Sequence, residues 1–267
     1  MSAPLDTKTQ LTGYLRELHL PAIRQCFEEK ARQAERETLS YEQYLLELAE
    51  RECQERRENR ITRLLQESRL PLEKTLANFE LKRLPQRASR QVKALLDGTF
   101  LDRKENVLAF GNPGSGKTHL LSAIGQELIR AGRKVAFTTC VRLVQDLLLA
   151  KKELRLSRSL RKLAGYEALV IDDLGYVQQN REEMEVLFTV LAERYERGSV
   201  LISSNLPFSK WEAIFKDAMT TAAAIDRLVH HSVILELNVS SYRMEQAKKN
   251  KADGGGEEAV NKENGIT

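Results

Sequence analysis

The first 75 or so residues carry apolar positions at helical spacing and almost no strand pattern. One such set falls on a single helical face, namely Leu11, Tyr14, Leu15 and Leu18. A second helix is expected to begin at Pro21, because proline fits the first turn of a helix. Residues 40–43 read Ser-Tyr-Glu-Gln, a capping box that predicts a third, long helix ending near Leu70, before Pro71.

From Asn106 to about Leu237 short apolar runs alternate with helical spacing. The runs predict strands at 106–110, 168–171 and 199–204, and the first helix between them is expected over 118–130. This alternation is typical of an α/β fold, in which helices cover both faces of a parallel sheet. Four parts are expected: a helical domain for DNA or partner binding (1–75), a connector with a short helix (76–105), the α/β domain (106–245) and a polar, disordered tail (246–267).

Composition limits the class of protein. The chain has 267 residues, room for one large and one small domain, and a net charge of +4. No apolar run has the length of a membrane span and the N-terminus lacks a signal-peptide core, so we expect a cytoplasmic protein with no membrane partner. Its 3 cysteines and 4 histidines show neither a disulfide framework nor metal-ligand spacing. The histidines are expected to be structural or to face solvent.

Residues 111–118 read Gly-Asn-Pro-Gly-Ser-Gly-Lys-Thr, a complete phosphate-binding loop between a predicted strand and a predicted helix. Its backbone N–H groups and the helix N-terminus favour bound phosphate. Lys117 is expected to reach the β- and γ-phosphates of a nucleotide, and the Thr118 hydroxyl to hold Mg²⁺. The flanking elements argue against the alternative, a chance glycine-rich turn. The candidate nucleotide-binding residues are Gly111, Asn112, Pro113, Gly114, Ser115, Gly116, Lys117, Thr118 and His119.

Polar residues directly follow the strands predicted at 168–171 and 199–204. Asp172 is expected to reach the Mg²⁺ held by Thr118, and Asp173 to orient or deprotonate an attacking water. The Asn205 amide is expected to hold that water or the γ-phosphate. Without the other motifs, the two acids would be interpreted as caps of a buried strand, and Asn205 would be interpreted as a turn residue. Their order after a phosphate-binding loop favours the catalytic interpretation.

Four motifs occur in order: the loop, Leu-Val-Ile-Asp172-Asp173-Leu-Gly, Ser-Ser-Asn205-Leu-Pro-Phe-Ser-Lys-Trp211 and Ala-Ile-Asp226-Arg227-Leu-Val-His. Together they resemble the IstB/DnaC branch of the AAA+ ATPases over about residues 75–245. The N-terminal helices are more similar to IstB than to DnaC. IstB proteins are ATP-dependent helpers of the transposase of certain bacterial insertion sequences, whereas DnaC proteins load the replicative helicase. The resemblance implies an AAA+ P-loop core with a small N-terminal all-α domain.

The resemblance also implies roles for single residues. Residues 111–118 correspond to the Walker A loop, Asp172 and Asp173 to Walker B, and Asn205 to sensor 1. AAA+ proteins usually carry Glu at the second acid, so the shorter Asp173 implies slow hydrolysis. Arg227 corresponds to the arginine finger, which enters the site of a neighbouring subunit and therefore requires an oligomer. The alternative is a surface arginine paired with the adjacent aspartate.

The chain after Arg227 is too short and too polar for a helical lid, so no C-terminal lid is expected. Closure over the nucleotide would then come from neighbouring subunits or from the N-terminal domain. Residues 241–243 resemble a short ending found in the family, in which Arg243 is either a substitute for sensor 2 or a surface charge. Phe79 is either an adenine-side contact or a core residue.

Basic residues gather in three segments. Lys151, Arg155, Arg158 and Lys162 would share one face of a helix across 151–162, where related assemblies place elements that follow DNA. A solvated helix face is the alternative. The long N-terminal helix carries a second set, interleaved with acids that favour intrahelical pairs instead: Arg56, Arg57, Arg60 and Arg63. The connector carries the third: Lys82, Arg83, Arg87, Arg90 and Lys93. Without interleaved aromatics, phosphate contacts are favoured over base stacking.

The expected protein is an ATPase that uses ATP and Mg²⁺, oligomerises on double-stranded DNA and recruits a cognate transposase. A DnaC-like helicase loader is the near alternative and would prefer single-stranded DNA. A more distant alternative is a nucleotide-gated DNA scaffold that hydrolyses little ATP. A small-molecule kinase is disfavoured because Asn205 and Arg227 match a ring ATPase.

Overall fold

The computed structural model describes residues 6–175, 180–215, 218–239 and 241–242. Contacts divide the chain into two compact units, Met1–Arg63 and Leu64–Thr267. The division lies before the boundary predicted at residue 75, because the chain around residues 71–74 is bound to the α/β unit. There the Gln126 amide donates to the carbonyls of Pro71 (3.0 Å) and Lys74 (3.1 Å). The predicted tail at 246–267 and Arg243 lie outside the described residues.

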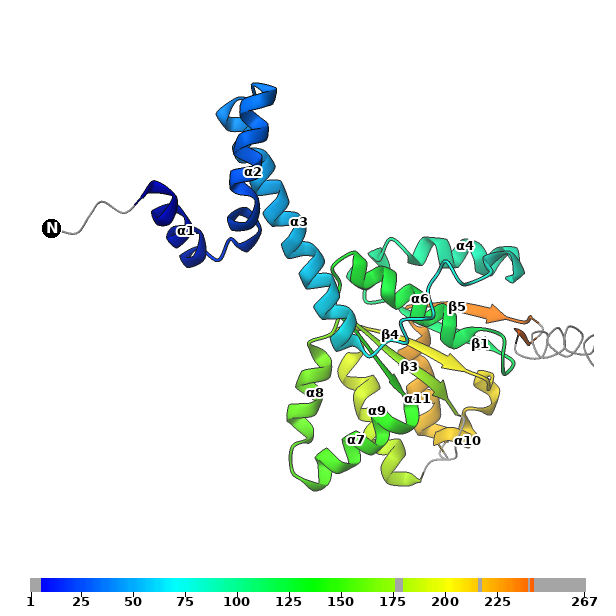
Figure 1. Cartoon of the computed structure of the whole chain (residues 1–267). Coiled ribbons are helices and arrows are strands. Elements are labelled where there is room, and N and C mark those ends of the chain that lie inside the picture. Colours follow the sequence, from blue (N-terminus) through cyan, green and yellow to red (C-terminus); the bar gives the residue numbers. More distant parts are fainter. Residues whose placement is uncertain (1–5, 176–179, 216–217, 240, 243–267) are drawn as a thin grey trace, which may run out of the picture. The chain divides into compact units, whose positions relative to one another are not determined.

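The helices predicted before residue 70 are present (Figure 1): α1 (Thr7–Glu17), α2 (Pro21–Glu37) and α3 (Tyr41–Ser68). The capping box before α3 is formed, since the Gln43 N–H donates to Ser40 Oγ (3.2 Å) and the Ser40 N–H to Gln43 Oε1 (3.0 Å). No helix within the described ranges is both long and apolar enough to cross a membrane.

Glu52 of α3 holds the beginning of α2. Its buried carboxylate accepts the backbone N–H groups of Ala22 (2.9 Å) and Ile23 (3.2 Å), which have no partner inside their own helix. Arg56 pairs with Glu52 (2.9 Å) and donates to the His19 carbonyl (2.6 Å). The intrahelical pair weighed against DNA contact is therefore formed at Arg56, which braces this unit.

The first elements that lie wholly within the second unit are η1 (Leu81–Arg83), α4 (Gln86–Leu95) and α5 (Thr99–Asp102). Its strands are β1 (Asn106–Gly111), β2 (Val135–Thr139), β3 (Ala168–Leu174), β4 (Ser199–Ser204) and β5 (Ser232–Leu237). They form one parallel sheet in the order β2-β3-β4-β1-β5, which confirms the predicted α/β class. The remaining helices are α6 (Lys117–Arg130), α7 (Cys140–Lys152), α8 (Leu156–Ala164), α9 (Arg181–Arg194), η2 (Phe208–Lys210), α10 (Glu212–Phe215) and α11 (Ala218–Val229).

Helices cover both faces of the sheet. Figure 1 shows α4 and α6 on one side and α7, α9 and α11 on the other. Side chains alternate between the two faces along each strand: Leu169 and Ile171 pack in the cluster with α7, α9 and α11, whereas Val170 between them does not. Near-complete burial of β1, β3 and β4 explains their continuous apolar runs.

The basic segment at 151–162 is two helices, so the prediction of one continuous helical face is wrong. Leu154 adopts a left-handed conformation (φ 56°) and ends α7. The Arg155 N–H donates to the Ala150 carbonyl (2.7 Å) and the Leu154 N–H to that of Lys151 (3.1 Å), the two bonds of a Schellman ending. That ending usually carries glycine, and Leu154 gives no such signal.

A buried arginine joins the turn before β4 to the end of α8. The terminal nitrogens of Arg194, whose residue is 4% exposed, donate to the carbonyls of Leu163 (2.9 Å), Tyr166 (3.0 Å), Glu167 (3.1 Å) and Ser199 (2.9 Å). Burial lowers the pKa of Arg194 to about 10, which leaves it cationic at neutral pH. A cation in contact with carbonyl oxygens can stay buried because those dipoles replace water.

Replacing Arg194 with methionine is expected to lower the free energy of unfolding by about 3 kcal/mol, since several buried carbonyls lose their donors. Urea denaturation followed by circular dichroism measures this. Arg197→Met is the matched control on the same turn, because its side chain is 75% exposed and pairs with Glu193 at 3.3 Å. Its effect should stay within about 0.5 kcal/mol. Equal effects of the two substitutions would contradict the bracing role.

Candidate functional site

The phosphate-binding loop joins the carboxyl end of β1 to the N-terminus of α6. Gly114 (φ 80°) and Gly116 (φ 94°) adopt left-handed conformations that favour glycine. A Cβ atom at Gly116 would lie 3.0 Å from Phe79 Cε2, and one at Gly114 would collide with Ser241. These two glycines therefore let the loop turn tightly and let neighbouring segments approach it.

Two side chains of the loop fit a bound phosphate. The Lys117 ammonium donates to the carbonyls of Gly111 (2.8 Å) and Asn112 (3.0 Å), which holds its charge within the loop. Ser115 Oγ is buried and makes no hydrogen bond to the described part of the chain. A buried hydroxyl of this kind is costly unless a ligand supplies its partner. The α6 N-terminus adds further backbone donors for an anion.

Asp172 lies behind the loop, where β3 ends. Its carboxylate accepts a hydrogen bond from the Thr118 hydroxyl (Oγ1···Oδ1 3.0 Å) and another from Ser203 Oγ on β4. The residue is 4% exposed, so these hydroxyls replace the water it has lost. Hydroxyl and carboxylate oxygens are ligands that Mg²⁺ accepts, so Thr118 and Asp172 fit the metal role predicted for them.

Asp173 is displaced from regular strand geometry. It has a left-handed backbone (φ 58°) at a register shift between Ile171 and Leu174, and its N–H donates to Ser203 Oγ (2.9 Å). Such a bulge redirects a side chain. Asp173 is exposed and lines the cavity described next, whereas the adjacent acid stays buried. The register shift in β3 thus leaves Asp172 buried and places Asp173 at the cavity.

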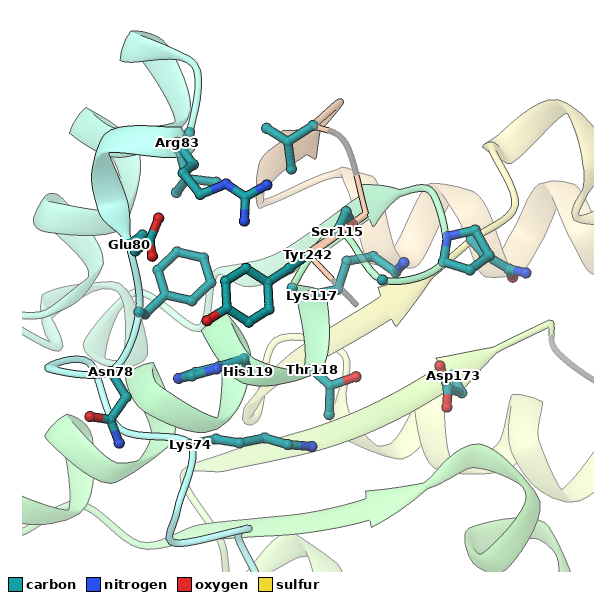
Figure 2. A pocket seen from close by; sticks show the side chains of 17 residues that line it. Lys74, Asn78, Glu80, Arg83, Ser115, Lys117, Thr118, His119, Asp173 and Tyr242 are labelled. Carbon is teal, nitrogen blue, oxygen red and sulfur yellow. The ribbon is translucent and has the colours of Figure 1, made fainter. Parts of the chain in front are cut away.

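A cavity of about 350 Å³ opens over the loop (Figure 2). The predicted residues that line it are Pro113, Gly114, Ser115, Gly116, Lys117, Thr118, His119, Asp173 and Asn205. Those outside the lining are Gly111, Asn112, Asp172 and Arg227. The connector and the residues just before it contribute side chains that the sequence did not single out for this site: Lys74, Asn78, Glu80, Arg83 and Leu84. Phe79 also lines the cavity, with its ring edge-on to His119 at 5.2 Å between centroids.

The end of the described chain closes one side of this cavity. Val239 and Tyr242 line it, and the Tyr242 N–H donates to the Gly114 carbonyl (3.1 Å). The Arg83 guanidinium lies over the Tyr242 ring, 5.2 Å from its centroid (Figure 2). Residues of the same α/β unit therefore cover one side of the site, which the prediction of closure by neighbouring subunits or the N-terminal domain did not include. Arg83 belongs to this cavity, although its sequence position suggested a DNA contact.

Arg227 is half-buried on α11. Its guanidinium lies over the Phe188 ring of α9, 4.9 Å from the centroid, and Nη1 donates to the Ala223 carbonyl (3.0 Å). A residue that serves a neighbouring subunit is expected to lie away from its own nucleotide. The position of Arg227 outside the cavity is compatible with that role.

The basic residues of 151–162 separate into two groups. The Lys151 ammonium pairs with Glu185 of α9 (3.0 Å). Arg155, Arg158 and Lys162 instead line one open hollow together with Asp146 and Glu153, and Arg155 pairs there with Glu153. On α3, Arg57, Arg60 and Arg63 are exposed. Phosphate contacts by these residues stay predictions.

Comparison with known sequences gives one family. The model of the family described as IstB-like ATP binding protein matches residues 13–251. An insertion-sequence ATP-binding protein of Sinorhizobium fredii is 43% identical over 242 residues, which cover 90% of this chain and 81% of the relative. One from Pseudomonas aeruginosa is 37% identical and covers 81% of this chain and 82% of the relative.

Solved structures resemble the chain in fold. The DnaC helicase loader aligns with a TM-score of 0.51 at 16% identity, covering 58% of this chain and 89% of the loader. DnaA of Aquifex aeolicus bound to AMPPCP aligns with a TM-score of 0.55 at 19% identity, covering 69% and 56%. The α/β unit therefore has the AAA+ fold that the motifs predicted.

Phe79→Ala is expected to weaken ATP binding about tenfold, because stacking of a base on an aromatic ring contributes roughly 1–3 kcal/mol. Fluorescence anisotropy with a labelled ATP analogue measures the dissociation constant. Inorganic triphosphate has no base and should compete equally well in both proteins. Leu72→Ala, at an exposed position before the connector and outside the lining, is the control. Weaker binding of triphosphate would show that Phe79 supports the loop and does not contact the base.

Proposed function

Because the chain belongs to the IstB-like ATP-binding family of AAA+ proteins, we propose that it hydrolyses ATP to assist a transposase on duplex DNA. The observation that carries the proposal is the Asp172 carboxylate in contact with Thr118 (3.0 Å), beside a cavity that also contains Asp173 and Asn205. A nucleotide-binding scaffold would need the loop but not this arrangement around it.

The chemistry assigned to the site is attack of water on the γ-phosphorus, which breaks its bond to the β–γ bridging oxygen and releases ADP and phosphate. Asp173 orients that water or takes its proton, and Asn205 holds the water or the phosphate. Lys117 and the α6 N-terminus stabilise negative charge that develops on the phosphate oxygens. When bound by Thr118 and Asp172, Mg²⁺ neutralises charge on the β- and γ-phosphates. Asp173 is short for this task, so we expect slow turnover.

Arg227 is assigned the role of an arginine finger that acts in a neighbouring subunit. Its place outside its own cavity supports that assignment. Hydrolysis then depends on assembly, and assembly on DNA would couple the nucleotide state to the DNA-bound oligomer. The insertion-sequence names of the relatives support a cognate transposase as the partner of this chain.

Duplex DNA is the proposed polymer, contacted through phosphates by the cluster of Arg155, Arg158 and Lys162. The helicase-loader alternative has the fold similarity to DnaC in its favour. It predicts tighter binding to single strands than to duplexes of equal length. Comparing the two affinities at one salt concentration separates the alternatives.

Arg227→Ala should lower DNA-stimulated hydrolysis by at least about a thousandfold, as expected for loss of a finger, while ATP binding persists. Phosphate release measures the rate. Arg197→Ala, an exposed arginine elsewhere in the same unit, should keep the wild-type rate. Lys117→Ala should also be inactive.

Mixing the two inactive proteins provides the decisive form of this experiment. The Arg227→Ala chain keeps an intact cavity, and the Lys117→Ala chain keeps an intact Arg227. If the finger acts between subunits, the mixture regains part of the wild-type activity. Full activity of Arg227→Ala alone would contradict the assignment. Absence of DNA-dependent phosphate release from the wild type would favour the scaffold.

Replacing Arg155, Arg158 and Lys162 together with alanine should weaken duplex binding and flatten its salt dependence. Each lost phosphate contact should reduce the slope of log K against log salt by about 0.9. Titrations at several salt concentrations measure that slope. Lys151→Ala is the control, because Lys151 lies outside the hollow and its ammonium pairs with Glu185 of α9. An unchanged slope in the triple variant would place the DNA elsewhere.

A further inference from the structure

Two turns of the α/β unit bring three metal-ligating side chains together. Glu196 lies in the turn between α9 and β4, and His230 and His231 lie in the turn between α11 and β5. Their nearest potential ligand atoms all lie within 4.8 Å of one another, and the three residues are exposed. Spacing in the sequence does not reveal this group, since β4, η2, α10 and α11 lie between Glu196 and the histidines.

Sheet topology explains why the turns meet. β4 and β5 lie on either side of β1 in a parallel sheet, so the turns that precede them reach the same edge. That edge holds the amino ends of the strands and is opposite the phosphate-binding loop, which follows the carboxyl end of β1. The group is therefore separate from the nucleotide site.

Buried contacts hold both turns in place. Asn106 of β1 donates through Nδ2 to the Leu228 carbonyl (3.1 Å), accepts the Val200 N–H (3.0 Å) and donates its own N–H to the His231 carbonyl (2.7 Å). Arg194 fixes the other turn through the Ser199 carbonyl (2.9 Å). Ligands on backbone fixed in this way lose little entropy when they bind an ion.

The surrounding groups suit a metal-bound imidazole. The Tyr195 hydroxyl lies 3.1 Å from His230 Nδ1, and the two histidine rings are 4.1 Å apart between centroids. When Nδ1 donates to Tyr195, the other ring nitrogen, Nε2, carries a free lone pair. Glu105 lies close enough to interact with His231, but its hydrogen bond from Arg103 (2.7 Å) lowers the pKa of the Glu105 carboxyl and already occupies it.

We propose that Glu196, His230 and His231 form a binding site for a late first-row divalent cation, of which Zn²⁺ is the expected ligand. Two imidazoles and one carboxylate suit Zn²⁺, whereas Mg²⁺ and Ca²⁺ prefer oxygen ligands. Ligand atoms on one tetrahedral Zn²⁺ are about 3.3 Å apart, so rotations of these exposed side chains have to bring ligand atoms that now lie within 4.8 Å of one another closer together. The bound ion would link the turn before β4 to the turn before β5.

The test uses the full chain without a histidine tag and without nucleotide. Calorimetric titration with Zn²⁺ should show one saturable site, and Co²⁺ should give the visible absorption of a tetrahedral complex. Tyr195→Phe should weaken Zn²⁺ binding by about tenfold, as expected when the hydrogen bond behind a ligating histidine is lost. His230→Ala and Glu196→Gln should weaken it at least as much.

Two controls separate this site from the nucleotide site. His119→Ala removes a histidine that lines the nucleotide cavity, and Asp172→Asn removes a carboxylate next to the loop. Both should bind Zn²⁺ with the wild-type affinity. Circular dichroism without metal shows whether each variant is folded. No saturable Zn²⁺ binding, or binding unaffected by His230→Ala in a folded protein, would overturn the proposal and leave the ATPase assignment intact.

Discussion

The site depends on one contact, the hydrogen bond between the Thr118 hydroxyl and the buried Asp172 carboxylate (3.0 Å). It joins the first turn of α6 to the end of β3, and Ser203 extends the connection to β4. A buried carboxylate without such donors would be costly, so the loop, two strands and one helix are constrained together. The same Ser203 hydroxyl accepts the N–H of Asp173, which fixes the second acid beside the first.

Residues outside the predicted motifs complete the cavity. Arg83 precedes β1 and Tyr242 follows β5, and each reaches the loop region through a tertiary contact. Together with Phe79 they give the nucleotide cavity aromatic and cationic surfaces, whereas the loop supplies groups for phosphate. One copy of the chain therefore provides both a phosphate-binding loop and a cavity surface suited to a base. The described residues contain no helical lid.

Features governed by local chemistry could be predicted from the sequence. The loop, the strands around it, the capping box at Ser40 and the start of α2 at Pro21 each depend on neighbouring residues. Features set by tertiary contacts could not. Leu154 ends α7 without glycine. Residues 71–74 are held to the α/β unit by carbonyls that Gln126 binds. His230 and Glu196 meet because of strand order.

The packing of Arg227 is compatible with a role in a neighbouring subunit on energetic grounds. Leaving Phe188 costs roughly 0.5–2 kcal/mol for the cation–π contact, and leaving the Ala223 carbonyl about 1 kcal/mol more. A finger that accelerates hydrolysis by about 10³- to 10⁵-fold supplies roughly 4–7 kcal/mol in the transition state. The gain exceeds the cost, so the packing of Arg227 against α9 in the free chain is compatible with the proposed role as an arginine finger.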